Sequence, residues 1–134
     1  MPTLADKILA RLHRKVRKRG AHFRQLDTDA QHDLRIELKK LRYAAEFFLP
    51  LYAGHAPAKR YVTRLARLQN SLGRARDIAS TRTLLNAVRQ DDQPALHLAI
   101  GAATGWQARD QIAVVKTLCK RWRQFKATPV FWGR

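Results

Sequence analysis

Basic and titratable side chains recur once per helical turn along residues 32–42. They are His32, Arg35, Lys39 and Arg42. On a helix that turns about 100° per residue, these side chains lie within an arc of about 80° and extend over about 15 Å. Arginine binds phosphate oxygens through two donors at once, and lysine binds them as a point charge. A row with one cation per turn therefore predicts binding of an extended anion.

Two further segments carry cations at the same helical spacing. One segment contributes Arg60, Arg64 and Arg67, joined by Arg74 if the helical phase continues past Gly73. The other contributes Arg109, Lys116, Lys120 and Arg123. Each row lies beside apolar positions of its own segment. Any one row could be a solvated helix face, but three rows with few acids to neutralise them favour a binding role. We expect the three rows to line one common surface of a helical bundle, with the chemistry of a phosphate-polymer site.

The overall charge balance also indicates an anionic partner. The 134 residues include 27 Lys and Arg against 10 Asp and Glu, which gives a formal net charge of +17 and an isoelectric point of about 11.4. An excess of one sign destabilises the compact state. The excess of positive charge therefore points to a polyanionic partner, which could be nucleic acid, an acidic membrane face or a phosphate polymer.

Chemistry other than anion binding has little support in the sequence. The single cysteine, Cys119, cannot form an internal disulfide or a zinc cluster, and it indicates a reducing compartment. The acids are scattered, and neither an HExxH nor a GxxxxGK[ST] motif occurs. We expect no enzyme activity, no catalytic residue, no metal and no cofactor. Four histidines have no ligand-like spacing and are expected to be structural or at the surface: His13, His22, His55 and His97.

The sequence gives no sign of a membrane segment. The first twenty residues are too charged for a signal peptide, and no run approaches the roughly 18 apolar residues of a membrane span. The basic first helix has a narrow apolar face, which bundle packing explains more simply than contact with a membrane surface. We therefore expect a cytoplasmic protein.

Apolar residues recur at three-to-four spacing throughout, and no segment alternates with the period of a strand. The pair Thr3 and Asp6 predicts a capped helix start, and Gly20 its end. A second helix is expected from Asp27 to Leu49, just before Pro50.

The remaining residues predict a third helix over 58–72 and a fourth over 76–89, separated at Gly73. Pro94 begins another stretch, which Gly101 and Gly105 are expected to break into a short piece and a final helix over 104–126. The apolar positions of the second, third and final helices form the expected core: Leu34, Leu38, Leu41, Ala45, Phe48, Tyr61, Leu65, Leu68, Leu72, Val115, Leu118, Trp122 and Phe125. With short connections, these helices predict an all-α, antiparallel helical bundle in one domain of residues 1–134.

Three motifs of this chain resemble the CHAD family, the conserved histidine α-helical domain. They are His32-x-x-Arg35-x-x-x-Lys39-x-Leu41-Arg42-Tyr43-x-x-Glu46-Phe47-Phe48, then Leu68-Gln69-x-x-Leu72-Gly73-x-x-x-Asp77, and finally Pro129-x-Phe131-Trp132. The resemblance extends from about residue 26 to the end of the chain. A full CHAD domain has two helical halves around a basic cavity. This chain carries the motif once and resembles the C-terminal half, which implies half of a two-bundle domain.

The resemblance implies a ligand and a location. CHAD domains bind inorganic polyphosphate, a linear anion, in the basic cavity and are targeted to polyphosphate granules. Residue by residue, the motif assigns this role to His32, Arg35, Lys39 and Arg42, with Arg64 and Arg67 just ahead of the second motif. The cavity would be completed by the missing half-domain or by a second copy of the chain in a homodimer.

A nucleic-acid-binding basic helical protein is the second hypothesis, because a basic surface attracts any polyanion. The basic rows contain few aromatic residues for base stacking, and no helix-turn-helix or zinc signature is apparent. The sequence therefore favours non-enzymatic polyphosphate binding.

Overall fold

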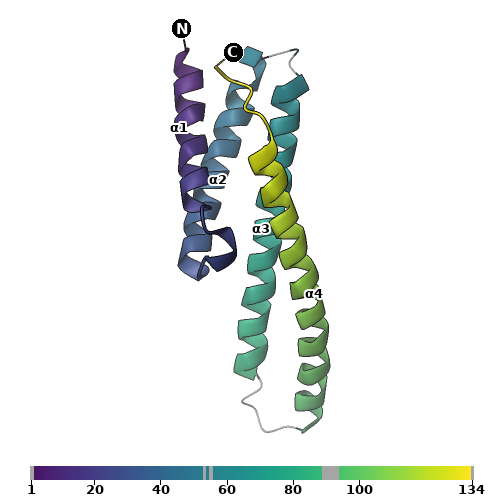
Figure 1. Cartoon of the computed structure of the whole chain (residues 1–134). Coiled ribbons are helices and arrows are strands. Elements are labelled where there is room, and N and C mark those ends of the chain that lie inside the picture. The colour runs from purple at the N-terminus through teal and green to yellow at the C-terminus, as the bar shows by residue number, and fades with distance from the viewer. Residues whose placement is uncertain (1, 53, 55, 89–93, 134) are drawn as a thin grey trace.

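The computed structural model of the chain describes residues 2–52, 54, 56–88 and 94–133. These residues form α-helices and short 3₁₀ helices without any strand: α1 (Leu4–Arg19), η1 (Phe23–Gln25), α2 (Thr28–Phe48), η2 (Leu49–Tyr52), α3 (Ala56–Val88) and α4 (Pro94–Ala127). Successive α-helices run in opposite directions (Figure 1). The expected all-α antiparallel bundle is confirmed.

The predicted starts of the first two helices are confirmed by their caps. Thr3 Oγ1 accepts a hydrogen bond from the backbone N–H of Asp6, and the Asp6 carboxylate accepts one from the backbone N–H of Thr3. Asp27 Oδ1 accepts a bond of 2.7 Å from the backbone N–H of Ala30. These side chains accept hydrogen bonds from backbone N–H groups that have no acceptor within the helix. The caps therefore fix where α1 and α2 begin.

The expected helix ends at Gly73, Gly101 and Gly105 are wrong. Gly73 lies within α3, and the other two glycines lie within α4. A glycine in a helix interior costs about 1 kcal/mol relative to alanine. Side-by-side packing of α3 and α4 over many turns outweighs that cost, so both helices stay continuous. The expected end of the fourth helix at residue 89 lies outside the described residues.

The buried core follows the expected apolar positions closely. Leu34, Leu38, Leu41 and Ala45 are fully buried, and so are the expected positions of α3 except Leu72, which is 2% exposed. On α4 the expectation of Val115 is wrong, because Val114 is buried and Val115 is 46% exposed. Val114 lies one helical turn before Leu118 on the buried side of α4, whereas Val115 is turned about 100° further toward solvent.

Aromatic rings join the ends of the helices on the side where the chain terminates. The Tyr61 ring of α3 contacts Phe125 of α4 and also Phe131 and Trp132 of the C-terminal segment, with ring centroids 5.2–5.5 Å apart. Tyr52 of η2 packs edge-on against Phe131. The C-terminal segment is therefore part of the core.

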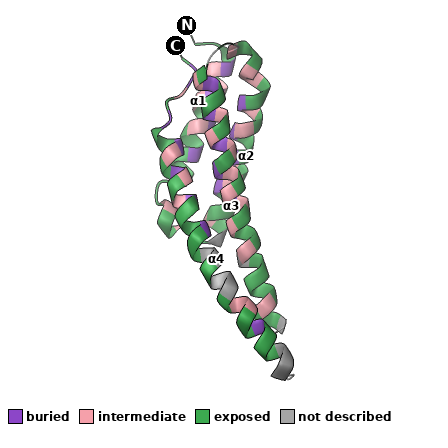
Figure 2. Ribbon diagram, turned by 90° about the vertical axis from the view of Figure 1, so that its right-hand side faces the viewer, coloured by how far each residue is buried: buried purple, intermediate pink, exposed green. Residues whose placement is uncertain are grey.

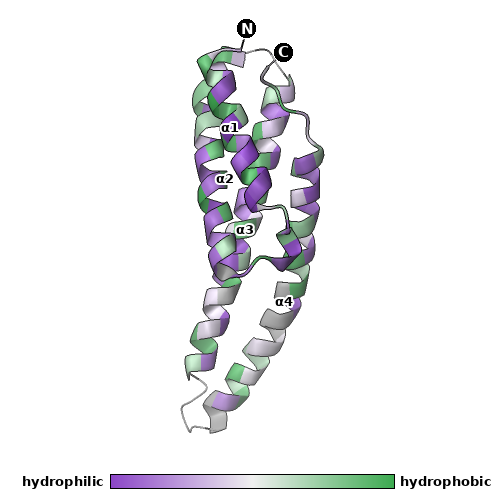
Figure 3. Ribbon diagram, turned by 60° about the vertical axis from the view of Figure 1, so that its left-hand side comes forward, coloured by the Kyte–Doolittle hydropathy of each residue, from purple (hydrophilic) through white to green (hydrophobic). Residues whose placement is uncertain are grey.

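Beyond the four-helix part, α3 and α4 continue alone as a two-helix extension (Figure 1). Ile78 and Val114 still line a cavity shared with Phe23 of η1, so we define the distal arm as residues 79–113. Buried residues concentrate in the four-helix part (Figure 2). The most hydrophilic residues are also most frequent there, whereas the described part of the arm is mostly paler or green, with scattered purple residues (Figure 3).

Gly20 caps α1 where the Trp122 ring approaches the backbone. A Cβ atom at Gly20 would lie 2.3 Å from two ring carbons of Trp122, far inside van der Waals contact. The ring is stacked on Phe23, with centroids 5.1 Å apart and planes inclined by 8°. The ring therefore has little room to move away, and this position requires glycine for space rather than for a left-handed backbone.

Gly20→Ala is predicted to destabilise the fold by about 1–3 kcal/mol through overpacking against Trp122. Gly73→Ala is the matched control, because a Cβ there meets nothing within 4 Å and the change should stabilise α3 by about 0.5–1 kcal/mol. Denaturant unfolding followed by circular dichroism measures both. Equal effects of the same sign would contradict the close approach of Trp122.

Candidate functional site

The cationic row of α2 lies along its border with α3. Arg42 Nε donates to Glu46 Oε1 over 3.0 Å, and its NH1 group donates to Gln69 Oε1 of α3 over 3.3 Å. Lys39 Nζ lies 5.8 Å from the centroid of the Tyr43 ring. Arg35, one helical turn before Lys39 in the row, is half-buried. The row is thus anchored against α3 at the Arg42 end.

At the other end of the row, α3 adds a further cation. Arg76 NH1 and His32 Nδ1 lie 3.2 Å apart, within hydrogen-bond distance. Arg76 comes seven residues after Gln69, so both share one side of α3. Arg76 is not among the predicted site residues, because a third helix that ends at Gly73 has no helical phase to place Arg76 on the same side as Gln69.

We call His32, Arg35, Lys39, Arg42 and Arg76 the α2 basic surface. The acids of α2 do little to neutralise it. Glu46 binds Arg42 at one end, but the other two described pairings of α2 acids lie elsewhere: Asp33 with Arg19 of α1 and Glu37 with Lys40, both at 3.9 Å. The α2 basic surface is therefore strongly positive and accessible at His32, Lys39 and Arg76, which are exposed.

The arginines predicted on α3 face a different neighbour. Arg64 NH1 donates to Thr128 Oγ1 over 2.8 Å, at the C-terminal end of α4. Arg67 lies two residues before Gln69, about 200° around the helix. Arg60 and Arg67 are exposed on this second side. The structure thus separates Arg60, Arg64 and Arg67 from the α2 basic surface.

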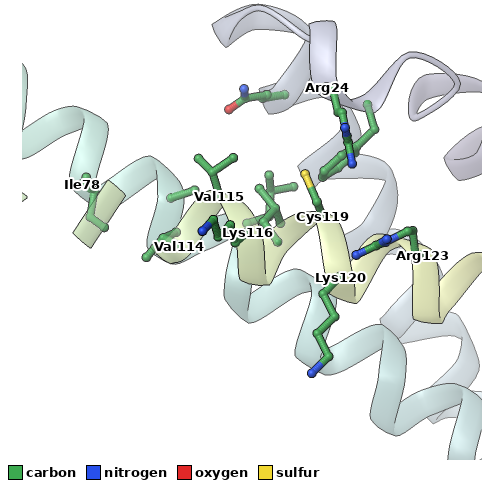
Figure 4. Close-up of a pocket in the computed structure, with 13 residues that line it drawn as sticks. Arg24, Ile78, Val114, Val115, Lys116, Cys119, Lys120 and Arg123 are labelled. Carbon is green, nitrogen blue, oxygen red and sulfur yellow. The ribbon is translucent and has the colours of Figure 1, made fainter. Parts of the chain in front are cut away.

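The cations predicted on α4 form a third group. Lys116 and Lys120 border a cavity of about 800 Å³ between α3, α4 and η1. The walls of this cavity are largely apolar. Arg24 of η1 lies above Cys119, whereas the Lys120 side chain extends away from Cys119 and Arg24 (Figure 4). Arg109 is exposed on the distal arm. The α4 row is therefore divided between this cavity and the distal arm. The expectation that all three rows line one common surface is wrong, because the arginines of the α3 row lie on the opposite side of α3 from Gln69 and Arg76.

Other kinds of site find no support in the described part of the chain. No group of three or more His, Cys, Asp or Glu residues there could hold a metal ion. No described helix is long and apolar enough to cross a membrane. The accumulated cations are the main chemical feature of the surface.

Residues 1–86 match the family described as the CHAD domain. The chain belongs to the CHAD family. The match spans α1, α2 and most of α3, so it contains the whole α2 basic surface. Searches among curated proteins and among solved structures find no match.

The CHAD match differs in extent from the resemblance given by the motifs. It begins at residue 1 rather than near residue 26, and it ends before α4. The closing Pro129–Trp132 motif lies outside it. The match therefore shows the family without assigning this chain to the C-terminal half of the domain.

His13 has a structural role, which is one of the two roles expected from the sequence. Its Nδ1 lies 2.8 Å from the Tyr61 hydroxyl oxygen, and its ring packs against Phe125 and Trp132. Burial, and to a lesser extent the charge of Arg17, lowers the pKa of His13 from 6.5 to about 4. The folded CHAD chain thus holds this imidazole neutral at physiological pH.

The stability of the fold is predicted to fall as the pH decreases from about 6.5 to about 4, because His13 in the unfolded chain then takes up a proton that the folded chain excludes. His13→Gln keeps a polar group near Tyr61 and should flatten this part of the curve. His22→Gln, at an exposed position, serves as the control. Denaturation midpoints measured across this pH range give the pH dependence of stability. If this dependence is unchanged in His13→Gln, groups other than His13 cause the loss of stability in acid.

Proposed function

We propose that this chain binds inorganic polyphosphate along the α2 basic surface and does so without catalysis. The proposal rests mainly on the close approach of His32 and Arg76, whose side-chain nitrogens lie 3.2 Å apart. These two residues extend the row of cations on α2, in which Glu46 forms an ion pair with Arg42. CHAD is a family of binding domains, and polyphosphate is its general ligand. Binding of this kind would bring the chain to polyphosphate granules in the cytoplasm.

The geometry suits a linear anion better than a compact one. From His32 to Arg42 the row extends about 15 Å at 1.5 Å per residue. An anionic oxygen can contact the side chains of His32 and Arg76 together, because Arg76 NH1 and His32 Nδ1 lie only 3.2 Å apart. Successive phosphates can then contact Lys39 and Arg42 one helical turn after another.

The cations outside the α2 basic surface have a longer-range role in this proposal. Arg60 and Arg67 are exposed on α3, and Lys116 and Lys120 on α4. Together they raise the positive potential around the bundle, which speeds the encounter with a polyanion. Arg64 differs from them because its guanidinium group holds the C-terminal end of α4.

Nucleic acid is the second candidate, and one observation favours it. Tyr43 and Phe47, beside the cations on α2, are 57% and 77% exposed. Exposed aromatic rings within a basic surface can stack on unpaired bases. Polyphosphate has no bases, so Tyr43→Ala and Phe47→Ala should weaken binding of a single-stranded oligonucleotide and leave polyphosphate binding unchanged.

Arg35→Ala, Lys39→Ala and Arg42→Ala should each weaken polyphosphate binding by about 1 kcal/mol, or about fivefold. Fluorescence anisotropy with labelled polyphosphate of defined length measures the affinity at several salt concentrations. For the unaltered chain it should fall roughly 10- to 100-fold between about 50 and 200 mM salt, and each variant should reduce the slope by about one. Circular dichroism checks that each variant is folded.

Arg11→Ala is the control because it removes the same charge from an exposed position on α1. It should change the affinity by less than about twofold. An equal loss in Arg11→Ala and Lys39→Ala would show that net charge alone governs binding and would contradict a defined site.

Displacement of polyphosphate by an oligonucleotide at equal phosphate concentration would favour the nucleic-acid hypothesis. Release of inorganic phosphate from polyphosphate in the same samples would contradict the absence of catalysis.

A further inference from the structure

The distal arm exposes apolar residues on the side of α4 that faces away from α3. Leu98 is 80% exposed and Ile112 is 60% exposed, whereas Ile100, on the inner side, is 4% exposed. Leu98, Gly105 and Ile112 follow one another at intervals of seven residues, which keeps them on one side of the helix over about 21 Å. We call Leu98, Gly101, Gly105 and Ile112 the outer stripe.

The glycines of the outer stripe leave the surface of α4 flat. A Cβ at either Gly101 or Gly105 would meet no atom within 4 Å, so neither glycine is needed for packing within the chain. Each weakens an isolated helix by about 1 kcal/mol. Another helix could approach closely here, between the projecting side chains of Leu98 and Ile112.

Charge sets the arm apart from the rest of the chain. Residues 79–113 contain three arginines (82, 89 and 109) and three aspartates (91, 92 and 110), so their net charge is zero. The whole formal charge of +17 therefore belongs to the remaining residues. The arm can approach an identical arm without the repulsion that separates the basic parts of two chains.

We propose that the outer stripe binds the same stripe of a second copy of this chain, with the two α4 helices antiparallel and crossing at Gly105. Because 98 and 112 are equally distant from 105, a twofold axis there places Leu98 of each copy against Ile112 of the other. The four helices of the two arms then lie side by side in one layer, in the order α3, α4, α4, α3. The antiparallel arrangement keeps the two basic parts at opposite ends.

The other exposed apolar side of the molecule suits a second copy less well. Tyr43 and Phe47 on α2 are exposed, but Lys39 and Lys40 lie among them. Two copies joined there would bring like charges together, whereas the outer stripe belongs to an arm whose net charge is zero. The proposal goes beyond polyphosphate binding and does not depend on it, since α4 lies outside the residues matched to the family.

Sedimentation equilibrium of the full chain over a wide micromolar range tests the proposal. The short stripe predicts a dimer with a dissociation constant in the micromolar range. High salt should leave this dimer intact or strengthen it, because apolar contacts are not screened. An association that disappears at high salt would reflect bridging by a bound polyanion and would overturn the proposal.

A charge exchange across the twofold axis tests the register. Leu98→Glu and Ile112→Lys should each raise the dissociation constant by about tenfold or more, because each places two unpaired charges in the interface. The double variant pairs a carboxylate with an ammonium group at both contacts and should recover most of the dimer. Recovery must weaken at high salt, unlike the association of the unaltered chain.

Leu84→Glu is the matched control, because Leu84 is 64% exposed on α3 of the same arm and outside the outer stripe. It should leave the dissociation constant unchanged, and circular dichroism should show all variants folded. A chain that stays monomeric at every concentration overturns the proposal, as does a dimer that persists in Leu98→Glu. Single variants that dissociate without recovery in the double variant overturn the antiparallel register.

Discussion

The ring cluster around Tyr61 is the contact on which the bundle depends. Tyr61 is fully buried and brings together His13 of α1, Phe125 of α4 and the C-terminal Phe131 and Trp132. Aromatic side chains bury the largest apolar areas, and their edge-to-face pairs add about 0.5–1.5 kcal/mol each. A chain of net charge +17 needs such a contact, because repulsion among its cations opposes the compact state.

This core also determines where the cations can act. With Leu34, Leu38 and Leu41 fixed in the interior, the row from His32 to Arg42 must follow the edge of α2 that borders α3. The antiparallel course of α3 then brings Arg76 to His32 and Gln69 to Arg42. The α2 basic surface is thus a consequence of how two amphipathic helices pack, and the distal arm, which lacks this packing, carries no net charge.

The helical class, the caps and most core positions could be predicted from the sequence because each depends on local periodicity. The same reasoning failed at Gly73, Gly101 and Gly105, where tertiary packing keeps a helix continuous through residues that weaken it. That failure had a further effect, since an assumed break at Gly73 hid the phase linking Gln69 to Arg76. Which side of a helix a cation faces, as for Arg64 at the end of α4, depends on neighbours that a single sequence does not specify. The row on α2 could be found because its motif and its helical phase are both local.

Amide and side-chain NMR of the isotope-labelled chain, titrated with short polyphosphate at physiological salt, locates the binding site residue by residue. The largest chemical-shift changes should occur at the α2 basic surface: His32, Arg35, Lys39, Arg42 and Arg76. They should saturate together, as expected for one defined site. Changes centred on Arg60, Arg67 and Lys120, or spread evenly over all exposed cations, would contradict the assignment of binding to the α2 basic surface.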